Sequence, residues 1–136
     1  MVYAGPVVES GGWSVLAAVA VGSSVGGVAR HLVTETVVRW TGGVFPWGTV
    51  FANVSGSLVI GVLAGASLSA SPPVWRHGIV TGVLGGYTTF SAFSVQTLTL
   101  LQQGQVLAAA ANVTLSVALG LAACWAGFAL TAGLSR

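Results

Sequence analysis

The sequence predicts an all-α integral membrane protein with four transmembrane helices, the third of which is broken in the middle of the membrane. Hydrophobic residues make up 54% of the chain and charged residues only 4%, against about 25% charged in a typical soluble domain. Four apolar stretches are each long enough to cross the hydrocarbon core as a helix, which takes about 20 residues. The third stretch carries two adjacent glycines and two adjacent threonines near its centre.

The composition excludes several classes of protein. A soluble surface needs about 25–35% charged residues, so a soluble enzyme is excluded. Nucleic-acid binding is excluded because four scattered arginines form no basic patch. The single cysteine, Cys124, rules out an internal disulfide. We therefore expect residues 1–136 to form one four-helix unit, a multi-pass protein of the cell membrane (the inner or plasma membrane) that is not an enzyme.

The first two predicted spans cover residues 13–33 and 47–68. Between them, the segment 34–46 contains three threonines, two glycines and a proline, so we expect an interfacial loop there. The second span begins directly after that proline. Serines and the pair Pro72–Pro73 end it, because proline cannot continue a helix.

The third and fourth predicted spans cover residues 75–101 and 106–134. A glutamine-rich turn separates them. Tryptophan prefers the headgroup region of a membrane, and four tryptophans fall at predicted span ends: Trp13, Trp40, Trp47 and Trp75. Four spans place both termini on the same side of the membrane.

The centre of the third span is poor helix material. Gly85 and Gly86 are followed by the β-branched pair Thr88 and Thr89, and both residue types disfavour the helix. A break at this depth frees backbone carbonyls that can bind a small cation, and the N-terminus of a half-helix attracts anions. The alternative is a continuous helix in which the threonine hydroxyls bond back to the preceding turn.

Two aromatic residues and one amide stand out beside this break. Phe90 and Phe93 are three residues apart and share a helix face. Their positive ring edges can contact an anion, although core packing explains the same spacing. On the second span, the Asn53 side chain offers two N–H donors to an anion or bonds across to another helix.

Other polar residues lie on the fourth and first spans. Asn112 and Ser116 are four residues apart on one face, which is consistent with a polar track or with packing hydrogen bonds. Arg30, near the end of the first span, either extends to the interface or places a fixed positive charge in a vestibule that draws anions inward.

The distribution of charge bears on both mechanism and orientation. Glu9 and Glu35 lie outside the spans, so no carboxylate within the membrane is available to a proton-coupled exporter. The arginines divide evenly between the two sides: Arg30 and Arg39 on one, Arg76 and Arg136 with the termini on the other. An excess of Lys and Arg on one side of the membrane normally sets the orientation of the chain. Here either a partner or downstream signal sets it, or the chain inserts both ways and assembles with an inverted copy.

Three sequence blocks together resemble the Fluc (CrcB) family of fluoride channels. Residues 26–31 read Gly-Gly-Val-Ala-Arg-His, similar to the family's small-residue run ending in Arg. Residues 48–57 match its Gly-Thr…Asn…Gly-Ser signature. Residues 85–94, Gly-Gly-Tyr-Thr-Thr-Phe-Ser-Ala-Phe-Ser, are close to its most specific motif. The four-span layout extends the resemblance over nearly the whole chain.

The resemblance implies a dual-topology, antiparallel dimer with two fluoride pathways in the lipid bilayer. It implies a structural Na⁺, not transported, bound at the dimer centre by the backbone carbonyls of Gly85 and Thr88. Arg30 would lie in the aqueous vestibule. The residues that it assigns to the fluoride pathway are Asn53, Thr89, Phe90, Ser91 and Phe93, with Asn112 and Ser116 on the fourth span.

The expected function is passive export of fluoride from the cytoplasm, which lowers intracellular fluoride. Three residues depart from the family pattern: Ala92 replaces Thr, Gln96 replaces Glu and Asn112 replaces Tyr. The missing glutamate leaves open a homodimer or a pair with a paralogous subunit. The alternative functions are a small dual-topology multidrug-type transporter, which lacks its carboxylate here, and a non-conducting membrane assembly subunit.

Overall fold

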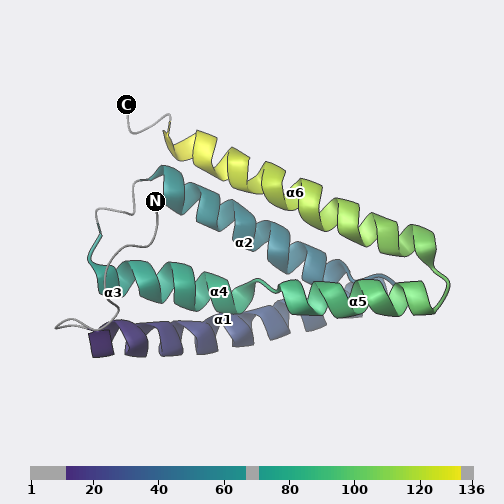
Figure 1. The fold of residues 1–136 in the computed structure, drawn as a ribbon, viewed down its shortest axis with the longest axis horizontal. Helices are drawn as coiled ribbons and strands as arrows, with labels where there is room; N and C mark the ends of the chain where they lie inside the picture. Colours follow the sequence, from purple (N-terminus) through teal and green to yellow (C-terminus); the bar gives the residue numbers. More distant parts are fainter. Residues whose placement is uncertain (1–11, 67–70, 133–136) are drawn as a thin grey trace.

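The computed structural model describes residues 12–66 and 71–132, and all regular secondary structure in these residues is helical. Four stretches of helix are long and apolar enough to cross a membrane. The prediction of an all-helical chain with four spans is therefore confirmed. Successive spans run in opposite directions, so the beginning of the first and the end of the last lie at the same end of the bundle (Figure 1).

Helix α1 (Gly12–Thr41) is longer than the predicted first span. The loop expected over 34–46 is wrong for residues 34–41, which remain helical. The reason is that Thr36 and Thr41 donate their hydroxyls to carbonyl oxygens four residues earlier, so threonine does not end the helix here. The helix ends at Thr41, and the following Gly42 adopts a φ of +76° that residues with a side chain rarely take.

Helices α2 (Trp47–Gly65) and α6 (Val106–Ala132) begin at the predicted residues. Pro46 precedes α2, and a turn with positive φ at Gly104 precedes α6. The predicted ends of these spans, at residues 68 and 134, lie outside the described residues.

The third span consists of two helical halves. The first half is formed by α3 (Pro73–Arg76), η2 (His77–Leu84), whose turns are of the wider π type, and α4 (Gly85–Tyr87). The second half is α5 (Phe90–Gln102). Between them Thr88 and Thr89 have extended backbone, with φ, ψ of −83°, 155° and −152°, 116°.

The helices pack in two pairs, α1 beside α3, η2 and α4, and α2 beside α6 (Figure 1). Glycine sets the close approach in both pairs. A Cβ added to Gly26 would overlap the Val83 carbonyl oxygen, and one added to Gly61 would overlap the Cys124 carbonyl oxygen. Backbones therefore touch without intervening side chains, as small residues allow in membrane helix packing.

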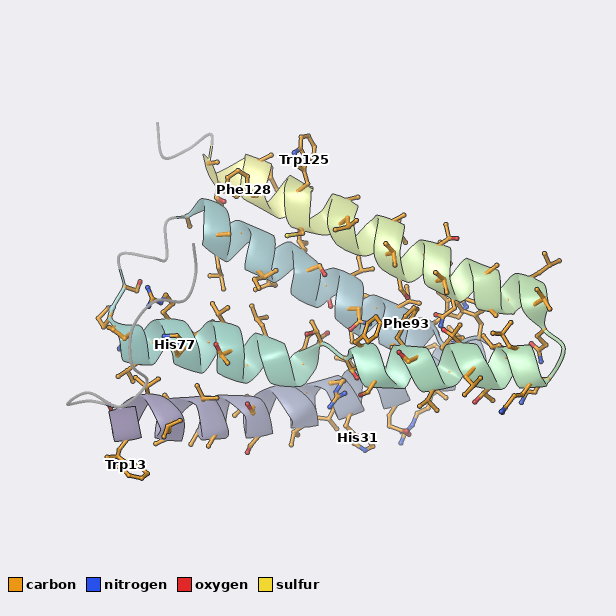
Figure 2. All side chains as sticks on the ribbon, in the orientation of Figure 1. Trp13, His31, His77, Phe93, Trp125 and Phe128 are labelled. Atoms are coloured by element: carbon orange, nitrogen blue, oxygen red, sulfur yellow. The ribbon has the colours of Figure 1, made fainter. Side chains whose placement is uncertain are left out.

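Most large apolar side chains point outward. Leu107 on α6 is 88% exposed and Trp40 on α1 is 84% exposed, and Figure 2 shows Trp13 and Trp125 projecting away from the bundle. In water such a surface is unfavourable. It suits a chain surrounded by lipid tails.

Candidate functional site

The extended residues of the third span are held by a side chain from α2. Asn53 Nδ2 donates to the Thr89 carbonyl oxygen at 3.1 Å, and the Thr89 N–H donates to Asn53 Oδ1 at 2.8 Å. The amide thus satisfies both backbone groups of a residue that has left the helix, as a neighbouring strand would. Thr89 is buried, so these two groups would otherwise remain unpaired.

Glycine on α2 makes room for this arrangement. A Cβ on Gly56 would lie 2.5 Å from Thr88 Cγ2 and 3.2 Å from the Tyr87 ring. One residue earlier, Ser55 Oγ lies 3.0 Å from the Tyr87 hydroxyl. Helix α2 therefore contacts the end of α4 and the extended pair along one face, through Asn53, Ser55 and Gly56.

Hydroxyl groups gather at the start of α5. Thr89 caps this helix, because its Oγ1 accepts a hydrogen bond from the Ala92 N–H at 3.2 Å. Ser91 Oγ lies 3.2 Å from Thr89 Oγ1. The helix N-terminus carries a partial positive charge, so this position combines a favourable potential for anions with hydroxyl donors.

Two backbone carbonyls lose their helical partners at the same place. In a continuous helix the Gly85 carbonyl would accept from the Thr89 N–H, and the Thr88 carbonyl from the Ala92 N–H. Those two donors bond Asn53 Oδ1 and Thr89 Oγ1 instead. The carbonyls of Gly85 and Thr88, which the family resemblance assigns to Na⁺, are therefore of the kind that binds a hard cation.

Oxygen atoms of the backbone are the candidate cation ligands at the interruption. No group of three or more His, Cys, Asp or Glu side chains that could hold a metal exists in residues 12–66 and 71–132. Two carbonyl oxygens are too few to replace the hydration shell of a cation, which takes about six oxygen ligands. The oxygen chemistry fits Na⁺, and the ligand number fits only if further oxygens come from outside this chain.

A pocket of about 370 Å³ opens beside the interruption. Its lining changes from polar groups near the extended pair to aliphatic side chains along η2 and α2. The residues that line it are Asn53, Gly56, Ser57, Ile60, Val80, Leu84, Gly85, Thr88, Thr89 and Phe90.

The two phenylalanines contact each other but differ in exposure. Their ring centroids are 5.3 Å apart, with an angle of 46° between the ring planes. Phe90 is 79% exposed and borders the pocket, whereas Phe93 is only 9% exposed. Figure 2 shows Phe93 pointing from α5 toward α2. The outer ring is thus available to a neighbouring molecule, and the inner ring is part of the core.

Asn112 and Ser116 lie elsewhere, between α6 and its neighbours. Asn112 Nδ2 donates to Thr97 Oγ1 at 2.9 Å, and Thr97 Oγ1 donates to the Phe93 carbonyl oxygen at 2.8 Å. Asn112 is thereby joined to the Phe93 turn of α5 and not to the Asn53–Thr89 pair. Ser116 is half-buried one helical turn further along α6.

Arg30 is half-buried on the face of α1 that meets the third span. Gly26, one turn earlier, would meet Val83 and the Tyr87 N–H if it carried a Cβ. Because residues four apart share a face, Arg30 lies about one turn beyond Tyr87, past the end of α4.

Sequence reasoning missed two contacts of this region. The Tyr87–Ser55 hydrogen bond and the Thr97–Asn112 hydrogen bond both cross between helices. The second had a usable signal, since Thr97 and Asn112 lie at similar distances on either side of the turn at 103–105 and so face each other in an antiparallel pair of helices. The Tyr87–Ser55 hydrogen bond had no such signal, because these residues do not lie at similar distances on either side of one turn.

Comparison with known proteins places these features in a family. The pattern of CrcB-like proteins (Camphor Resistance, CrcB) matches residues 17–128. The chain is 46% identical over 117 residues to the fluoride-specific ion channel FluC of Nitrobacter winogradskyi, covering 85% of this chain and 93% of the relative. It is 47% identical over 122 residues to the fluoride-specific ion channel FluC 2 of Bradyrhizobium diazoefficiens, covering 86% and 88%.

Proposed function

Since the chain belongs to the CrcB family, we propose that it is a subunit of a fluoride-selective channel that lets fluoride leave the cytoplasm passively. The observation that carries the proposal is the Asn53–Thr89 pair, which holds an opened helix with hydroxyls and an aromatic ring around it. The relatives are named ion channels and not enzymes, and the chain is a multi-pass membrane protein.

Selectivity for fluoride is proposed to come from replacing its water with a few fixed donors. Ser91 and Thr89 carry hydroxyls at the start of α5. Asn53 gives one N–H hydrogen to the Thr89 carbonyl, which leaves its second hydrogen for an anion. The ring edges of Phe90 and Phe93 add weaker positive poles. A narrow route with so few donors favours the small fluoride over chloride.

The direction of flow follows from physical chemistry. Hydrogen fluoride crosses the bilayer as a neutral acid and ionises in the cytoplasm, where the anion is trapped. The inside-negative membrane potential then favours outward movement of the anion. The electrical free energy is about 2.3 kcal/mol per elementary charge for each 100 mV. Arg30 is proposed to attract fluoride into the vestibule at one end of the pathway.

We propose that two copies assemble in opposite orientations. Phe90 and the Gly85 backbone are exposed on the single chain, and the pocket lies between them and α2, as expected for a surface that a second subunit covers. The even division of arginines between the two sides gives neither orientation an advantage. A paralogous subunit in place of the second copy remains the alternative, because Gln96 replaces the usual glutamate.

The antiparallel arrangement would double the number of backbone ligands at the cation site, toward the about six oxygens that a cation takes. Gly85 and Thr88 from two chains supply four backbone carbonyls. A bound Na⁺ would supply positive charge that holds the two interruptions together. Fluoride efflux should therefore weaken when Na⁺ is exchanged for N-methyl-D-glucamine at constant ionic strength, and recover when Na⁺ returns. Unchanged efflux after complete exchange would contradict the sodium assignment.

The purified chain alone, reconstituted in liposomes, tests the function. We expect a fluoride electrode to record efflux from vesicles loaded with KF, with Na⁺ present on both sides, once a potassium ionophore is added, and no chloride efflux under the same conditions. Efflux that required a proton gradient would favour a transporter. If neither ion leaves, co-reconstitution with a paralogous subunit distinguishes an obligate pair from a non-conducting assembly protein.

A further inference from the structure

Asn112 is held in one orientation by the hydrogen bonds around it. It is fully buried on α6, with 0% of its surface exposed, and its Nδ2 donates to Thr97 Oγ1. The hydroxyl hydrogen of Thr97 is already donated to the Phe93 carbonyl oxygen, so Thr97 Oγ1 can only accept from Asn112. A flipped amide would bring two acceptors together. The Asn112 Oδ1 therefore points away from Thr97.

Three buried polar atoms on α5 and α6 have no hydrogen-bond partner in the described chain: Gln96 Oε1, Asn112 Oδ1 and Ser116 Oγ. Buried polar atoms without a protein partner are commonly satisfied by ordered water. Asn112 and Ser116 are four residues apart, so their Cβ atoms lie about 5–6 Å apart on one helix face. The two oxygen atoms extend from these neighbouring Cβ atoms, and a water with two hydrogen bonds of about 2.8 Å joins oxygens that lie up to about 5.6 Å apart.

We infer that a bound water bridges Asn112 Oδ1 and Ser116 Oγ at the packed face of α6. Asn112 Oδ1 only accepts, so the water donates one O–H to it. The Ser116 hydroxyl donates its hydrogen to the water oxygen. This arrangement satisfies both side chains and leaves the second O–H of the water for another acceptor.

The water changes what this part of α6 offers to an anion. A bare amide oxygen repels fluoride, whereas the bound water presents an O–H donor in the same place. Resting on the proposed function, the inference gives Asn112 and Ser116 an indirect role in conduction. Fluoride that passes α6 is solvated by the bound water and not by the Asn112 oxygen.

Crystal structures of the purified protein and of Ser116→Ala, both in fluoride-free chloride buffer, test the water directly. We expect a peak about 2.7–3.2 Å from both Asn112 Oδ1 and Ser116 Oγ in the wild type, and its loss in the variant. No peak in the wild type, or one that persists in Ser116→Ala, overturns the inference. A peak that forms only in fluoride, or one with contacts of about 2.4 Å typical of a hard cation, also overturns it.

Fluoride efflux tests the role in conduction. Losing one hydrogen bond to the water should slow efflux by Ser116→Ala about tenfold. The matched control is Thr114→Ala, which removes an exposed hydroxyl from the same helix and should keep the wild-type rate. Equal rates for Ser116→Ala and wild type overturn the role in conduction. If the wild type carries no fluoride, the proposed function fails, and the crystal structures still decide whether the water binds.

Discussion

The amide nitrogen and the amide oxygen of Asn53 both form hydrogen bonds with the same residue. Its Nδ2 and Oδ1 bond the carbonyl and the N–H of Thr89, 36 positions away in sequence. An alanine at this position cannot replace either bond, and an aspartate can accept from the N–H but cannot donate to the carbonyl. The pair therefore makes the shape of the third span depend on a single side chain of α2.

For Asn53→Ala we expect loss of both stability and fluoride efflux. Two backbone groups of Thr89 lose their partner, at about 1–3 kcal/mol for each buried group left unpaired. The midpoint of thermal unfolding and the efflux rate should fall together. Ser24→Ala is a suitable control, because Ser24 is exposed and bonds only the Ala20 carbonyl of its own helix. A wild-type efflux rate in Asn53→Ala would reduce Asn53 to a packing residue.

The two phenylalanines should respond differently to the same substitution. Phe90→Ile and Phe93→Ile both remove a ring edge, so both are expected to abolish fluoride efflux from proteoliposomes while leaving the proposed dimer intact. Within the single chain only Phe93 is buried, so Phe93→Ile should lower the unfolding midpoint more than Phe90→Ile, since a change of shape in the core costs about 1–3 kcal/mol.

The control for this comparison is Phe128→Ile on α6, whose ring is exposed and distant from the interruption (Figure 2). It should leave efflux and stability unchanged. Unchanged efflux in both Phe90→Ile and Phe93→Ile would remove the ring edges from the mechanism.

At the residue scale, the sequence indicates candidate side chains but not the groups that they contact. Spacing and resemblance point to Asn53, Thr89 and Phe93 as candidates, and their role in conduction stays a prediction. Their partners do not follow from the sequence, because an amide can donate or accept in any direction and its partner is set by the tertiary fold. The bond from Asn112 to Thr97 instead of to the Asn53 cluster is one result of this freedom.

At the element scale, helix boundaries followed glycine and proline more closely than polarity. Helix α2 begins after Pro46, and α1 ends directly before Gly42. The segment 34–41 is polar yet helical, because hydrogen bonds within the helix satisfy its threonines. Composition indicates where a chain can be buried in lipid, whereas helix ends are set by backbone conformation.

The contact between α1 and the third span allows a matched test with two adjacent glycines. Gly26→Ala places a methyl group on the Val83 carbonyl oxygen, whereas a Cβ on Gly27 meets nothing within 4 Å. Gly26→Ala should destabilise the protein by about 1–3 kcal/mol because the helices must separate. Gly27→Ala should be neutral or stabilising by up to about 1 kcal/mol, since alanine favours the helix.

Thermal unfolding followed by circular dichroism measures both variants under the same conditions. A similar unfolding midpoint for Gly26→Ala and Gly27→Ala would mean that α1 is not packed closely against η2. A lower midpoint for Gly27→Ala alone would mean that the outer face of α1 is covered in the assembled protein.

At the scale of the whole molecule, the sequence predicts the four spans but does not distinguish a surface that meets lipid from one that would meet a second subunit. Exposed apolar side chains look alike in composition whether they meet lipid or protein, as Leu107 and Phe90 illustrate. The antiparallel dimer therefore stays a prediction, and it is best tested through the orientation of the chain in the membrane.

Adding positive charge to one end should fix the orientation. Gln103→Arg with Gln105→Arg biases the turn before α6 toward the cytoplasm, and Ser71→Arg with Pro72→Arg biases the opposite end. Each double variant expressed alone should lose fluoride efflux, because only one orientation is made. Coexpression of the two should restore it.

The readout is fluoride efflux from cells together with labelling of a cysteine introduced at the turn. Activity from either double variant alone, with every copy in one orientation, would contradict the antiparallel dimer. Inactivity of the coexpressed pair would show that the added arginines act through something other than orientation.

The Asn53–Thr89 bonds have a consequence for assembly. Because an amide within the same polypeptide compensates the lost helical bonds, the unwound stretch is stabilised within the single chain. Association of two copies, as proposed above, would then join two preorganised surfaces, and neither copy would have to melt a turn of helix in lipid at the moment of encounter.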